Sequence, residues 1–408
     1  MNIVLISTLY PPNVVGGAER VAQDVAEALA GEGHTVSVIC LAEERRAEPT
    51  AVNGVRIHHC RLENLYWPFP VSHAPYAKKV LWHLLDSYNP AMARSVGALL
   101  DGIRPDVVNT HNIAGFSVAV WGAVKARRLP LVHTLHDQYL LCPYSTMFKN
   151  GRNCETRCFG CRLASAPRSR MAGRVDSVTG VSRFILQRHL DHGLFSRANA
   201  AVVYSSYQPP GSAAVEGSAQ ARRPLRIGFL GRLDRTKGLD RLIDAFLGLA
   251  PGDSELWVAG SGDPGYEAEL KQRTTGRADV RWLGFVAPEA FLPQVQVLAV
   301  PSLWHEAMGR VVLEAFAHGV PVIGANRGGI PEIVERDCGW IVDPERSAEL
   351  QAALQRCVER PEMLAEMRPA ALAASRRFSR QAMLAGYLAA YQGAIWPEAQ
   401  ARPDPGRA

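Results

Sequence analysis

The chain has 408 residues, of which 47% are hydrophobic and 21% are charged, and its formal net charge is +6. This composition is ordinary for a globular protein of two or three domains and excludes a largely disordered chain. The positive charge is modest and comes mainly from arginine, so it suits anionic ligands or an anionic membrane surface and argues against a dedicated nucleic-acid binder. No apolar run approaches the ~18 residues that a membrane-spanning helix needs.

The beginning of the chain predicts a strand–helix–strand unit. The first residues, MNIVLISTLYPP, lack a basic region and a small-residue cleavage site, so we expect no signal peptide and a cytoplasmic location. The apolar run from Asn2 to Ser7 is typical of a strand buried on both faces of a parallel sheet. A helical pattern from Ala18 to Ala30 and an apolar run from Val36 to Leu41 complete the unit. Further strands are predicted at Val55–His58, Val107–Thr110, Leu131–Leu135 and Val175–Val181.

A stretch rich in Pro, Gly, Ser and Ala, from Tyr207 to Arg223, is the best candidate for a linker. After it, strands are predicted at Leu225–Leu230, Glu255–Ala259, Val280–Leu283, Val297–Val300 and Val320–Ile323, with helical patterns between them. Two doubly wound α/β domains facing a cleft are therefore expected, with ligands at the carboxyl ends of the strands. The predicted ranges are 1–206 for the first domain, 207–224 for the linker, 225–380 for the second domain and 381–400 for a C-terminal helix.

Two glutamates flank the start of a predicted helix in the second domain. Glu306 lies in the loop before the helix, and Glu314 lies eight residues later within an almost wholly apolar segment. The first-turn amides near Met308, Gly309 and Arg310 form a helix N-terminus, which attracts anions. This layout suits a nucleotide sugar, with the diphosphate at the helix tip and one carboxylate each for the sugar and ribose hydroxyls. Alternatively, Glu314 pairs with Arg310 four residues earlier and Glu306 is a solvated loop acid.

Basic residues occupy the first strand-to-helix loop of the second domain. Arg232 and Lys237 stand where cations can clamp a diphosphate, although a solvated basic loop is the alternative. The chain contains no D-x-D triplet, so we expect these cations and helix termini, rather than a metal cofactor, to neutralise a diphosphate. In the first domain, Gly16 and Gly17 stand at a predicted helix N-terminus where backbone can approach a phosphate, but ordinary turns also contain such pairs.

Histidines follow two of the predicted strands of the first domain. His111 comes directly after Val107–Thr110, and His136 and Asp137 come directly after Leu131–Leu135. Both positions lie at carboxyl ends of strands and face the expected cleft. A single histidine is more often structural than catalytic, but two at equivalent strand ends strengthen the catalytic interpretation.

Four cysteines are clustered in the first domain. They are Cys142, Cys154, Cys158 and Cys161. Four thiolates suit a tetrahedral structural Zn²⁺, and the alternatives are reduced thiols or transient disulfides. The four scattered cysteines are interpreted as small buried hydrophobic residues, and they are Cys40, Cys60, Cys338 and Cys357.

The segment from Leu65 to Leu85 combines five aromatic residues with Lys78 and Lys79. Aromatic and basic surface segments dock on anionic lipid, so peripheral membrane association is one interpretation. The other is a helical hairpin whose aromatic residues fill the core.

Taken together, these motifs resemble those of a family 4 retaining glycosyltransferase of the GT-B fold. The main motif is E-x7-E, here Glu306 to Glu314 in HEAMGRVVLE. GGAER, GRLDRTKGLD, VAGSGD, GGIPEIV and GWIVDP support it in the expected order along nearly the whole chain. LWHLLDSYNP, PDVVNTHN and HDQYLLCP are typical of a subgroup with a cysteine-containing insertion, here residues 142–161. Two departures bear on donor fit: YSSYQPP replaces the usual Asn-Gly at the end of the first domain, and Met308 replaces the usual Phe.

The resemblance implies a role for each matching residue. Glu306 would contact the hydroxyls of the transferred sugar and Glu314 the ribose, while Arg232 and Lys237 would neutralise the leaving diphosphate. The other implied site residues are His136 beside the donor sugar, His111 and Asp137 on the acceptor side, Gly16 and Gly17 near the phosphates, and Gly284, Phe285 and Val286, whose backbone would hold the base. The C-terminal helix would cross back onto the first domain.

The implied reaction transfers a hexose from a UDP- or GDP-linked donor to a glycan, lipid-linked or small-molecule acceptor, with retention at the anomeric carbon. Front-face attack, in which the leaving phosphate helps to deprotonate the acceptor, is the mechanism that the family implies. Synthesis of cell-surface polysaccharide or glycoconjugate in the cytoplasm, at the inner face of the membrane if the aromatic segment docks there, would follow. A sugar-nucleotide epimerase of the same architecture and a non-catalytic nucleotide-sugar-binding protein stay open as alternatives.

Overall fold

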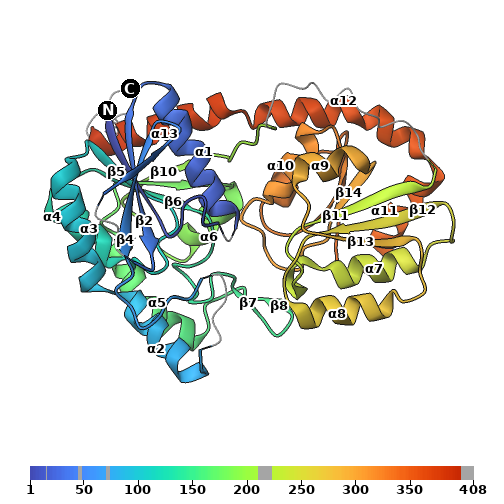
Figure 1. The fold of residues 1–408 in the computed structure, drawn as a ribbon, viewed down its shortest axis with the longest axis horizontal. Coiled ribbons are helices and arrows are strands. Elements are labelled where there is room, and N and C mark those ends of the chain that lie inside the picture. Colours follow the sequence, from blue (N-terminus) through green and yellow to red (C-terminus); the bar gives the residue numbers. More distant parts are fainter. Residues whose placement is uncertain (15, 45–47, 70–73, 210–222, 397–408) are drawn as a thin grey trace, which may run out of the picture. The chain divides into compact units, whose positions relative to one another are not determined.

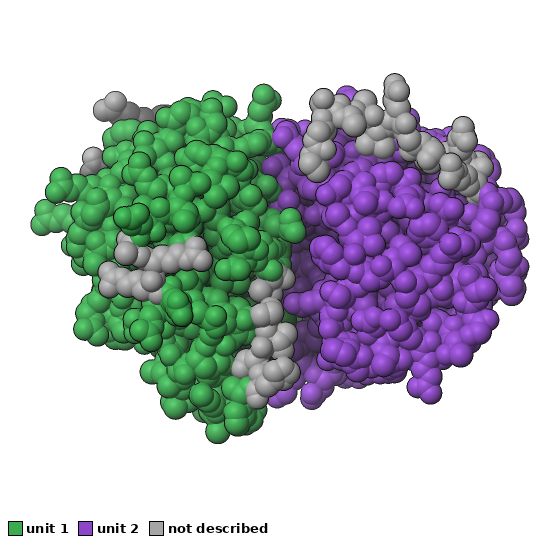
Figure 2. All heavy atoms as spheres, viewed as in Figure 1, with its two compact units in different colours: residues 1–147, 154–204, 380–408 green, residues 148–153, 205–379 purple. Residues whose placement is uncertain are grey.

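The computed structural model describes residues 1–408 except 15, 45–47, 70–73, 210–222 and 397–408. The chain divides into two compact α/β units (Figure 1). The first unit comprises residues 1–147, 154–204 and 380–408, and the second comprises residues 148–153 and 205–379 (Figure 2). Most of the predicted linker, residues 207–224, lies outside the described residues.

In the described part of the first unit, eight strands form one sheet in the order β10-β9-β6-β5-β1-β2-β4-β3. The strands are β1 (Asn2–Ser7), β2 (Thr35–Ala42), β3 (Thr50–Val52), β4 (Val55–Arg61), β5 (Val107–Thr110), β6 (Leu131–Leu135), β9 (Ser177–Gly180) and β10 (Asn199–Val202). The pairs are parallel except β3 with β4, which is antiparallel. Every residue of β5, β6 and β9 is buried, as expected for parallel strands covered on both faces.

The helices of the first unit before residue 200 are α1 (Gly17–Gly31), α2 (Tyr76–Ser87), α3 (Pro90–Ile103), α4 (Ala119–Ala126), α5 (Phe159–Ala172) and α6 (Arg183–Asp191). Local chemistry explains where they begin. The Asn89 side chain accepts hydrogen bonds from the amides of Ala91 and Met92, and Pro90 occupies the first turn, so α3 starts there. In the part of the chain that the structure describes, no helix has the length and apolar character needed to cross a membrane.

The last helix, α13 (Arg380–Ile395), belongs to the first unit. It packs on α1 and on β5, β6, β9 and β10. Tyr387 and Tyr391 are fully buried, and the Tyr391 hydroxyl accepts a hydrogen bond from Asn109 Nδ2 at 2.9 Å. The prediction that the C-terminal helix returns to the first domain is confirmed.

In the described part of the second unit, six parallel strands form a sheet in the order β13-β12-β11-β14-β15-β16. The strands are β11 (Leu225–Leu230), β12 (Ser254–Ala259), β13 (Val280–Gly284), β14 (Val297–Val300), β15 (Val322–Ala325) and β16 (Gly339–Val342). The helices are α7 (Leu239–Leu247), α8 (Pro264–Arg273), α9 (Pro288–Phe291), α10 (Arg310–Ala317), α11 (Ser347–Glu359) and α12 (Pro361–Arg377), with 3-10 turns η1 (Arg235–Lys237), η2 (Leu292–Gln294) and η3 (Ile330–Glu332). The alternation of strands and helices confirms the predicted doubly wound fold.

One strand of the second unit begins later than predicted. The sequence predicts a strand from Val320, whereas β15 starts at Val322. The amide of Val320 donates to the Ala315 carbonyl at 2.9 Å and so closes the end of α10. Pro321 has no amide hydrogen to donate, so the ladder can begin only after it.

A short hairpin, β7 (Phe148–Lys149) with β8 (Arg152–Asn153), is grouped with the second unit, whereas the sequence analysis places residues 142–161 in the first domain. The Asn153 side chain explains this grouping. Its Nδ2 donates to the Leu303 carbonyl at 2.7 Å, and its Oδ1 accepts from the His305 amide at 3.0 Å.

Replacement of a buried tyrosine of α13 should destabilise the first unit. We expect Tyr391→Ala to lower the free energy of unfolding by about 3–5 kcal/mol, because it leaves a cavity and removes the partner of Asn109. Gln392→Ala, an exposed change one residue along the same helix, should have little effect. Denaturant unfolding of both variants measures the difference, and equal stabilities would contradict this packing.

Candidate active site

Glu306 lies in the loop after β14, and Lys237 lies in the loop after β11, the neighbouring strand. Both loops therefore follow the carboxyl ends of adjacent parallel strands, where α/β sheets bind ligands. The two side chains meet, with Lys237 Nζ 2.6 Å from Glu306 Oε1. The structure thus brings together two residues that stand 69 positions apart in the sequence.

The Glu306 carboxylate is buried and strongly hydrogen-bonded. Besides Lys237, Oε1 accepts a hydrogen bond from Ser302 Oγ at 2.8 Å and one from Trp304 Nε1 at 2.9 Å. Burial alone would raise the pKa of Glu306, but the charge of Lys237 and these hydrogen bonds outweigh it and hold the pKa below its ordinary value. Glu306 is therefore an ionised buried carboxylate, and the alternative of a solvated loop acid is wrong.

Two glycines permit the backbone approaches that hold this loop. Gly238 has a φ of +69°, and a Cβ at this position would lie 2.1 Å from the Pro301 carbonyl oxygen. Gly328 has a φ of +63°, and a Cβ there would lie 1.9 Å from the Glu306 carbonyl oxygen. Only glycine fits at either position, so the loops after β11 and β15 both press against the segment that carries Glu306.

Arg232 is half-exposed and already has a partner. Its Nε lies 2.5 Å from Asp234 Oδ2, and the other oxygen of Asp234 accepts hydrogen bonds from the amide and hydroxyl of Thr236. The ion pair with Asp234 therefore holds the Arg232 guanidinium in a position that is about half exposed to solvent. Arg232 and Lys237 share one loop, but in the structure only Lys237 contacts Glu306.

The second glutamate lies on α10. Glu314 Oε1 is 3.3 Å from Arg310 Nε, and both side chains are mostly buried. The sequence left open whether Glu314 pairs with Arg310, and the structure contains this ion pair. Gly309 caps the helix with a φ of +86°, and Met308 is buried with its sulfur 3.3 Å from the Ser205 amide.

The residues expected to hold a base lie at the end of β13 and directly after it, and β13 is an edge strand of the second sheet. Gly284 has a φ of +67°, and its carbonyl accepts a hydrogen bond from the Gly260 amide at 2.7 Å. Phe285 is 77% exposed and Val286 is half-buried. The Phe285 ring is therefore exposed, and the hydrogen bond from Gly260 holds the backbone at Gly284 next to it.

In the first unit, Gly16 and Gly17 are exposed at the start of α1. The Gly16 amide donates to Glu19 Oε2 at 3.0 Å, so a buried carboxylate from the first turn of the helix fixes the loop. Burial raises the pKa of Glu19, and backbone hydrogen bonds partly offset this effect.

His111 and His136 follow β5 and β6, which are neighbours in the sheet, and their side chains meet. His111 Nδ1 lies 2.9 Å from His136 Nε2, and the rings stack with centroids 5.1 Å apart. Burial lowers the pKa of His136 to about 3, and the pKa of His111 is also well below its ordinary value because of burial and the neighbouring histidines. Both imidazoles are therefore neutral near pH 7, and one donates to the other.

Asp137 closes a turn beside this pair, because its Oδ1 accepts a hydrogen bond from the Tyr139 amide at 2.7 Å. Burial raises its pKa to about 6. A small cavity of about 10 Å³, room for one water molecule, is lined by His111, His136, Asp137 and Tyr139 among others.

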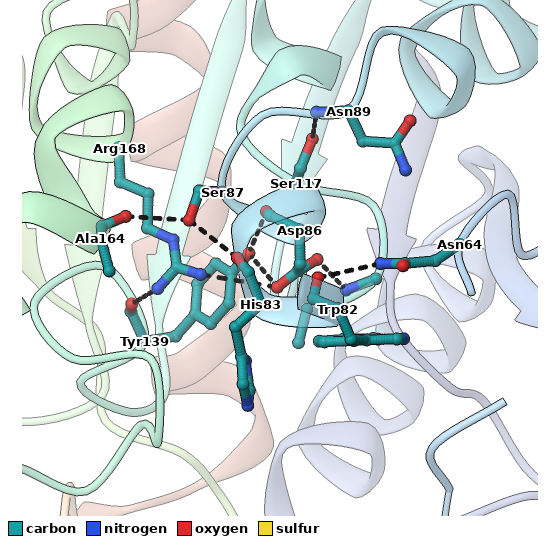
Figure 3. A network of polar contacts seen from close by, with 12 residues as sticks. Asn64, Trp82, His83, Asp86, Ser87, Asn89, Ser117, Tyr139, Ala164 and Arg168 are labelled. Carbon is teal, nitrogen blue, oxygen red and sulfur yellow. Dashed lines mark hydrogen bonds and ion pairs between the residues drawn. The ribbon is translucent and has the colours of Figure 1, made fainter. Parts of the chain in front are cut away.

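Tyr139 joins this turn to a buried polar network that the sequence pattern did not predict (Figure 3). Asp86 of α2 accepts hydrogen bonds from the Gly115 amide at 2.6 Å and from the Tyr139 hydroxyl at 2.7 Å. Arg168 of α5 lies 3.5 Å from Asp86, donates to the Tyr139 carbonyl at 2.6 Å and covers the Tyr139 ring at 3.8 Å. Asp86 and Arg168 are fully buried, so α2 and α5 together fix the turn that carries His136 and Asp137. The sequence alone could not predict this pairing, because Asp86 and Arg168 lie in separate helices that are far apart along the chain.

The prediction of a structural zinc site is not supported. Within the described residues, which include all eight cysteines, no group of three or more His, Cys, Asp or Glu is placed to hold a metal ion. Cys161 hydrogen-bonds with Cys158 and Cys142, and burial together with these neighbours raises the pKa of its thiol. The four scattered cysteines are buried, as predicted, and they are Cys40, Cys60, Cys338 and Cys357.

Comparison with known families gives two matches. Residues 15–207 match the family described as Glycosyltransferase Family 4, and residues 224–360 match the family described as Glycosyl transferases group 1.

Several relatives extend over most of the chain. The "Uncharacterized 42.6 kDa protein in cps region" of Klebsiella pneumoniae is 33% identical over 334 residues, which cover 82% of this chain and 87% of that protein. A GDP-mannose-dependent phosphatidylinositol dimannoside mannosyltransferase of Mycobacterium tuberculosis is 23% identical over 372 residues, 89% of each chain. Among solved structures, HepE of Anabaena in complex with UDP has a TM-score of 0.71 at 21% identity and covers 96% of this chain and 100% of its own. That likeness confirms the GT-B fold.

The burial of the histidine pair predicts the protonation state of His136 between pH 5 and pH 8. Because burial lowers the pKa of His136 to about 3, its imidazole should stay neutral from pH 8 down to pH 5. We expect its NMR signals, assigned with a His136→Gln variant, to stay constant over this range, whereas histidines of the denatured chain titrate near about 6.5. A midpoint near 6.5 in the folded protein would contradict the burial that we describe.

The buried ion pair in Figure 3 predicts how a substitution at Arg168 changes the stability of the folded protein. Arg168→Met should lower the free energy of unfolding by about 3 kcal/mol or more, because it leaves the buried Asp86 without its cation. Arg170→Met, an exposed change two residues along α5, is the matched control and should alter stability little. If both variants unfold at the same denaturant concentration, the buried pair does not anchor the turn.

Proposed function

The chain belongs to glycosyltransferase family 4, and we propose that it transfers a hexose from a nucleoside diphosphate sugar to a glycan, lipid-linked or small-molecule acceptor with retention of anomeric configuration. The observation that carries this proposal is the buried, ionised Glu306, held by Lys237 beside the N-terminus of α10. The names of the relatives support the donor class, since one solved neighbour binds UDP and one relative uses GDP-mannose. The two names differ in the base, which is uracil in UDP and guanine in GDP-mannose.

Glu306 is the proposed contact for the transferred sugar. The hydrogen bonds that the described residues make to its carboxylate converge on Oε1. The other oxygen, Oε2, is then the atom placed to accept hydrogen bonds from sugar hydroxyls. A carboxylate that is already desolvated and ionised needs little reorganisation to bind them.

Lys237 and Arg232 are the proposed contacts for the diphosphate. An ammonium group has three donors, so Lys237 can keep its bond to Glu306 and also reach a phosphate oxygen. Arg232, half-exposed beside Asp234, can turn its guanidinium to a second phosphate. The amides at Gly309 and Arg310, at the tip of α10, add a helix N-terminus to the same anion.

Glu314 is the proposed contact for the ribose. Its carboxylate lies one helical turn after Arg310 and forms an ion pair with it at 3.3 Å. The pair holds the carboxylate at a fixed place on α10, where it can accept hydrogen bonds from two ribose hydroxyls. The loop of Gly284, Phe285 and Val286 would hold the base through its backbone.

The residues of the first unit are proposed to serve both the donor and the acceptor. Neutral His136, held by His111, would lie beside the donor sugar, with Asp137 on the acceptor side. Gly16 and Gly17, fixed by Glu19, would allow the backbone to approach the phosphates.

In the proposed reaction the acceptor oxygen forms a bond to the anomeric carbon while the bond from that carbon to the diphosphate oxygen breaks. The electron pair of the broken bond stays on the diphosphate, and the acceptor proton passes to a phosphate oxygen of the leaving group. Lys237, Arg232 and the tip of α10 stabilise the charge that develops there, which gives catalysis without a metal cofactor. The place of the Klebsiella relative in a cps region supports a role in cell-surface polysaccharide synthesis.

Substitutions in the second unit separate binding from turnover. Lys237→Met should lower kcat by about a hundredfold or more, because it removes a cation that stabilises leaving-group charge. Glu314→Ala should weaken donor affinity by about tenfold to a hundredfold through the loss of ribose contacts. Release of nucleoside diphosphate and calorimetric titration with the donor measure the two quantities.

Arg241→Met is the matched control, since Arg241 is an exposed cation four residues after Lys237. It should retain wild-type kcat and affinity. The proposed site would be wrong if Lys237→Met and Glu314→Ala, both shown to be folded, also kept wild-type values. Turnover of the donor to an isomeric sugar nucleotide in the absence of any acceptor would favour the epimerase instead.

A further inference from the structure

The outward side of α2 is apolar. The helix turns Trp82 and Asp86 inward and exposes Ala77, Val80, Leu81, Leu84, Leu85 and Tyr88. These positions follow one another at intervals of three and four residues, so they form a single stripe along the helix. A surface helix of a globular protein normally carries charged or polar residues on this side.

Two segments that contact α2 carry further exposed apolar residues, and together with the stripe we call these residues the patch. Helix α5 packs against α2 and exposes Phe159 and Leu163, one helical turn apart and 84% and 67% accessible. The exposed Tyr144 lies edge-on against His83 of α2, with ring centroids 5.6 Å apart. Exposed apolar residues scattered singly are normal, but a contiguous patch marks an interaction site.

The charges around the patch select the partner. The exposed charged residues of α2 and α5 are all basic, and they are Lys78, Lys79, Arg162 and Arg170. Asp86, the acidic residue of these two helices, is buried against Arg168. A second copy of this chain would bring like charges together across a symmetric interface, whereas an anionic bilayer offers both apolar depth and negative charge.

We propose that the surface formed by α2, the exposed start of α5 and Tyr144 docks on an anionic lipid bilayer, with the apolar stripe in the headgroup–acyl boundary and the four cations at the phosphates. Docking would hold the first unit at the membrane independently of any transferase activity. The network of Asp86 and Arg168 joins α2 to α5 and so keeps the two helices in one docking surface.

Vesicle co-sedimentation of the full-length protein tests this surface. We expect the wild type to sediment with vesicles of phosphatidylcholine and phosphatidylglycerol, to bind vesicles of phosphatidylcholine alone more weakly, and to lose binding as salt is raised. The double variant Leu81→Asp/Leu84→Asp changes exposed residues, so it should fold normally and lower the bound fraction by about tenfold or more. Val52→Asp, an exposed apolar position of β3 in the same unit, is the matched control and should bind as the wild type does.

A charge variant gives a second readout. Lys78→Glu/Arg162→Glu should weaken binding to the anionic vesicles and reduce the salt dependence, whereas Arg61→Glu, exposed on β4, should do neither. The proposal is overturned if the wild type binds neither kind of vesicle, or if Leu81→Asp/Leu84→Asp binds as well as the wild type. It is also overturned if the wild type is a dimer that this double variant converts to a monomer, since the patch would then be an interface between copies.

Discussion

Burial of the Glu306 carboxylate is the constraint on which the rest of the second unit's site depends. Removing a carboxylate from water is costly, and the structure offsets this cost with Lys237, Ser302 and Trp304 on a single oxygen. The close backbone approaches at Gly238 and Gly328 let the loops after β11 and β15 pack against the loop that carries Glu306. The result is a fixed negative charge beside a cation and a helix N-terminus, and its second oxygen accepts no hydrogen bond from the described residues. Sugar hydroxyls can donate hydrogen bonds to such a carboxylate, and a diphosphate is attracted by the cation and the helix N-terminus.

The first unit also contains buried polar side chains, but they are histidines and an Asp–Arg pair. The carboxyl ends of β5 and β6 carry the neutral pair His111 and His136, whose pKa values are lowered by burial, next to the Asp137 turn. That turn rests on the buried pair of Asp86 and Arg168, which tie it to α2 and α5. The same pair therefore supports the candidate acceptor side and the surface that we assign to the membrane. A single substitution at Arg168 should disturb both.

The sequence predicted the fold well because parallel strands buried on both faces are nearly continuous apolar runs. Strands β1, β5, β6, β11 and β14 have the predicted bounds for this reason. The hairpin β7–β8 escaped prediction because two-residue strands have no periodicity and Asn153 is held by residues about 150 positions away. The site residues Glu306 and Lys237 could be picked out by their places after strands, but their direct contact could not. The network of Asp86 and Arg168 was invisible because isolated charges in helices usually lie in solvent, and the cysteine spacing suggested a metal site that the described residues do not form.

Calorimetric titration of the wild-type protein with UDP- and GDP-sugars, in buffer containing a chelator of divalent metal ions, tests the central claim most directly. The account predicts saturable binding of sugars linked to one of the two nucleotides, at one site per chain, with an affinity that the chelator does not change. No detectable binding of any sugar nucleotide by the folded protein, or binding that requires a divalent metal, would contradict a donor site built on Glu306, Lys237 and the tip of α10.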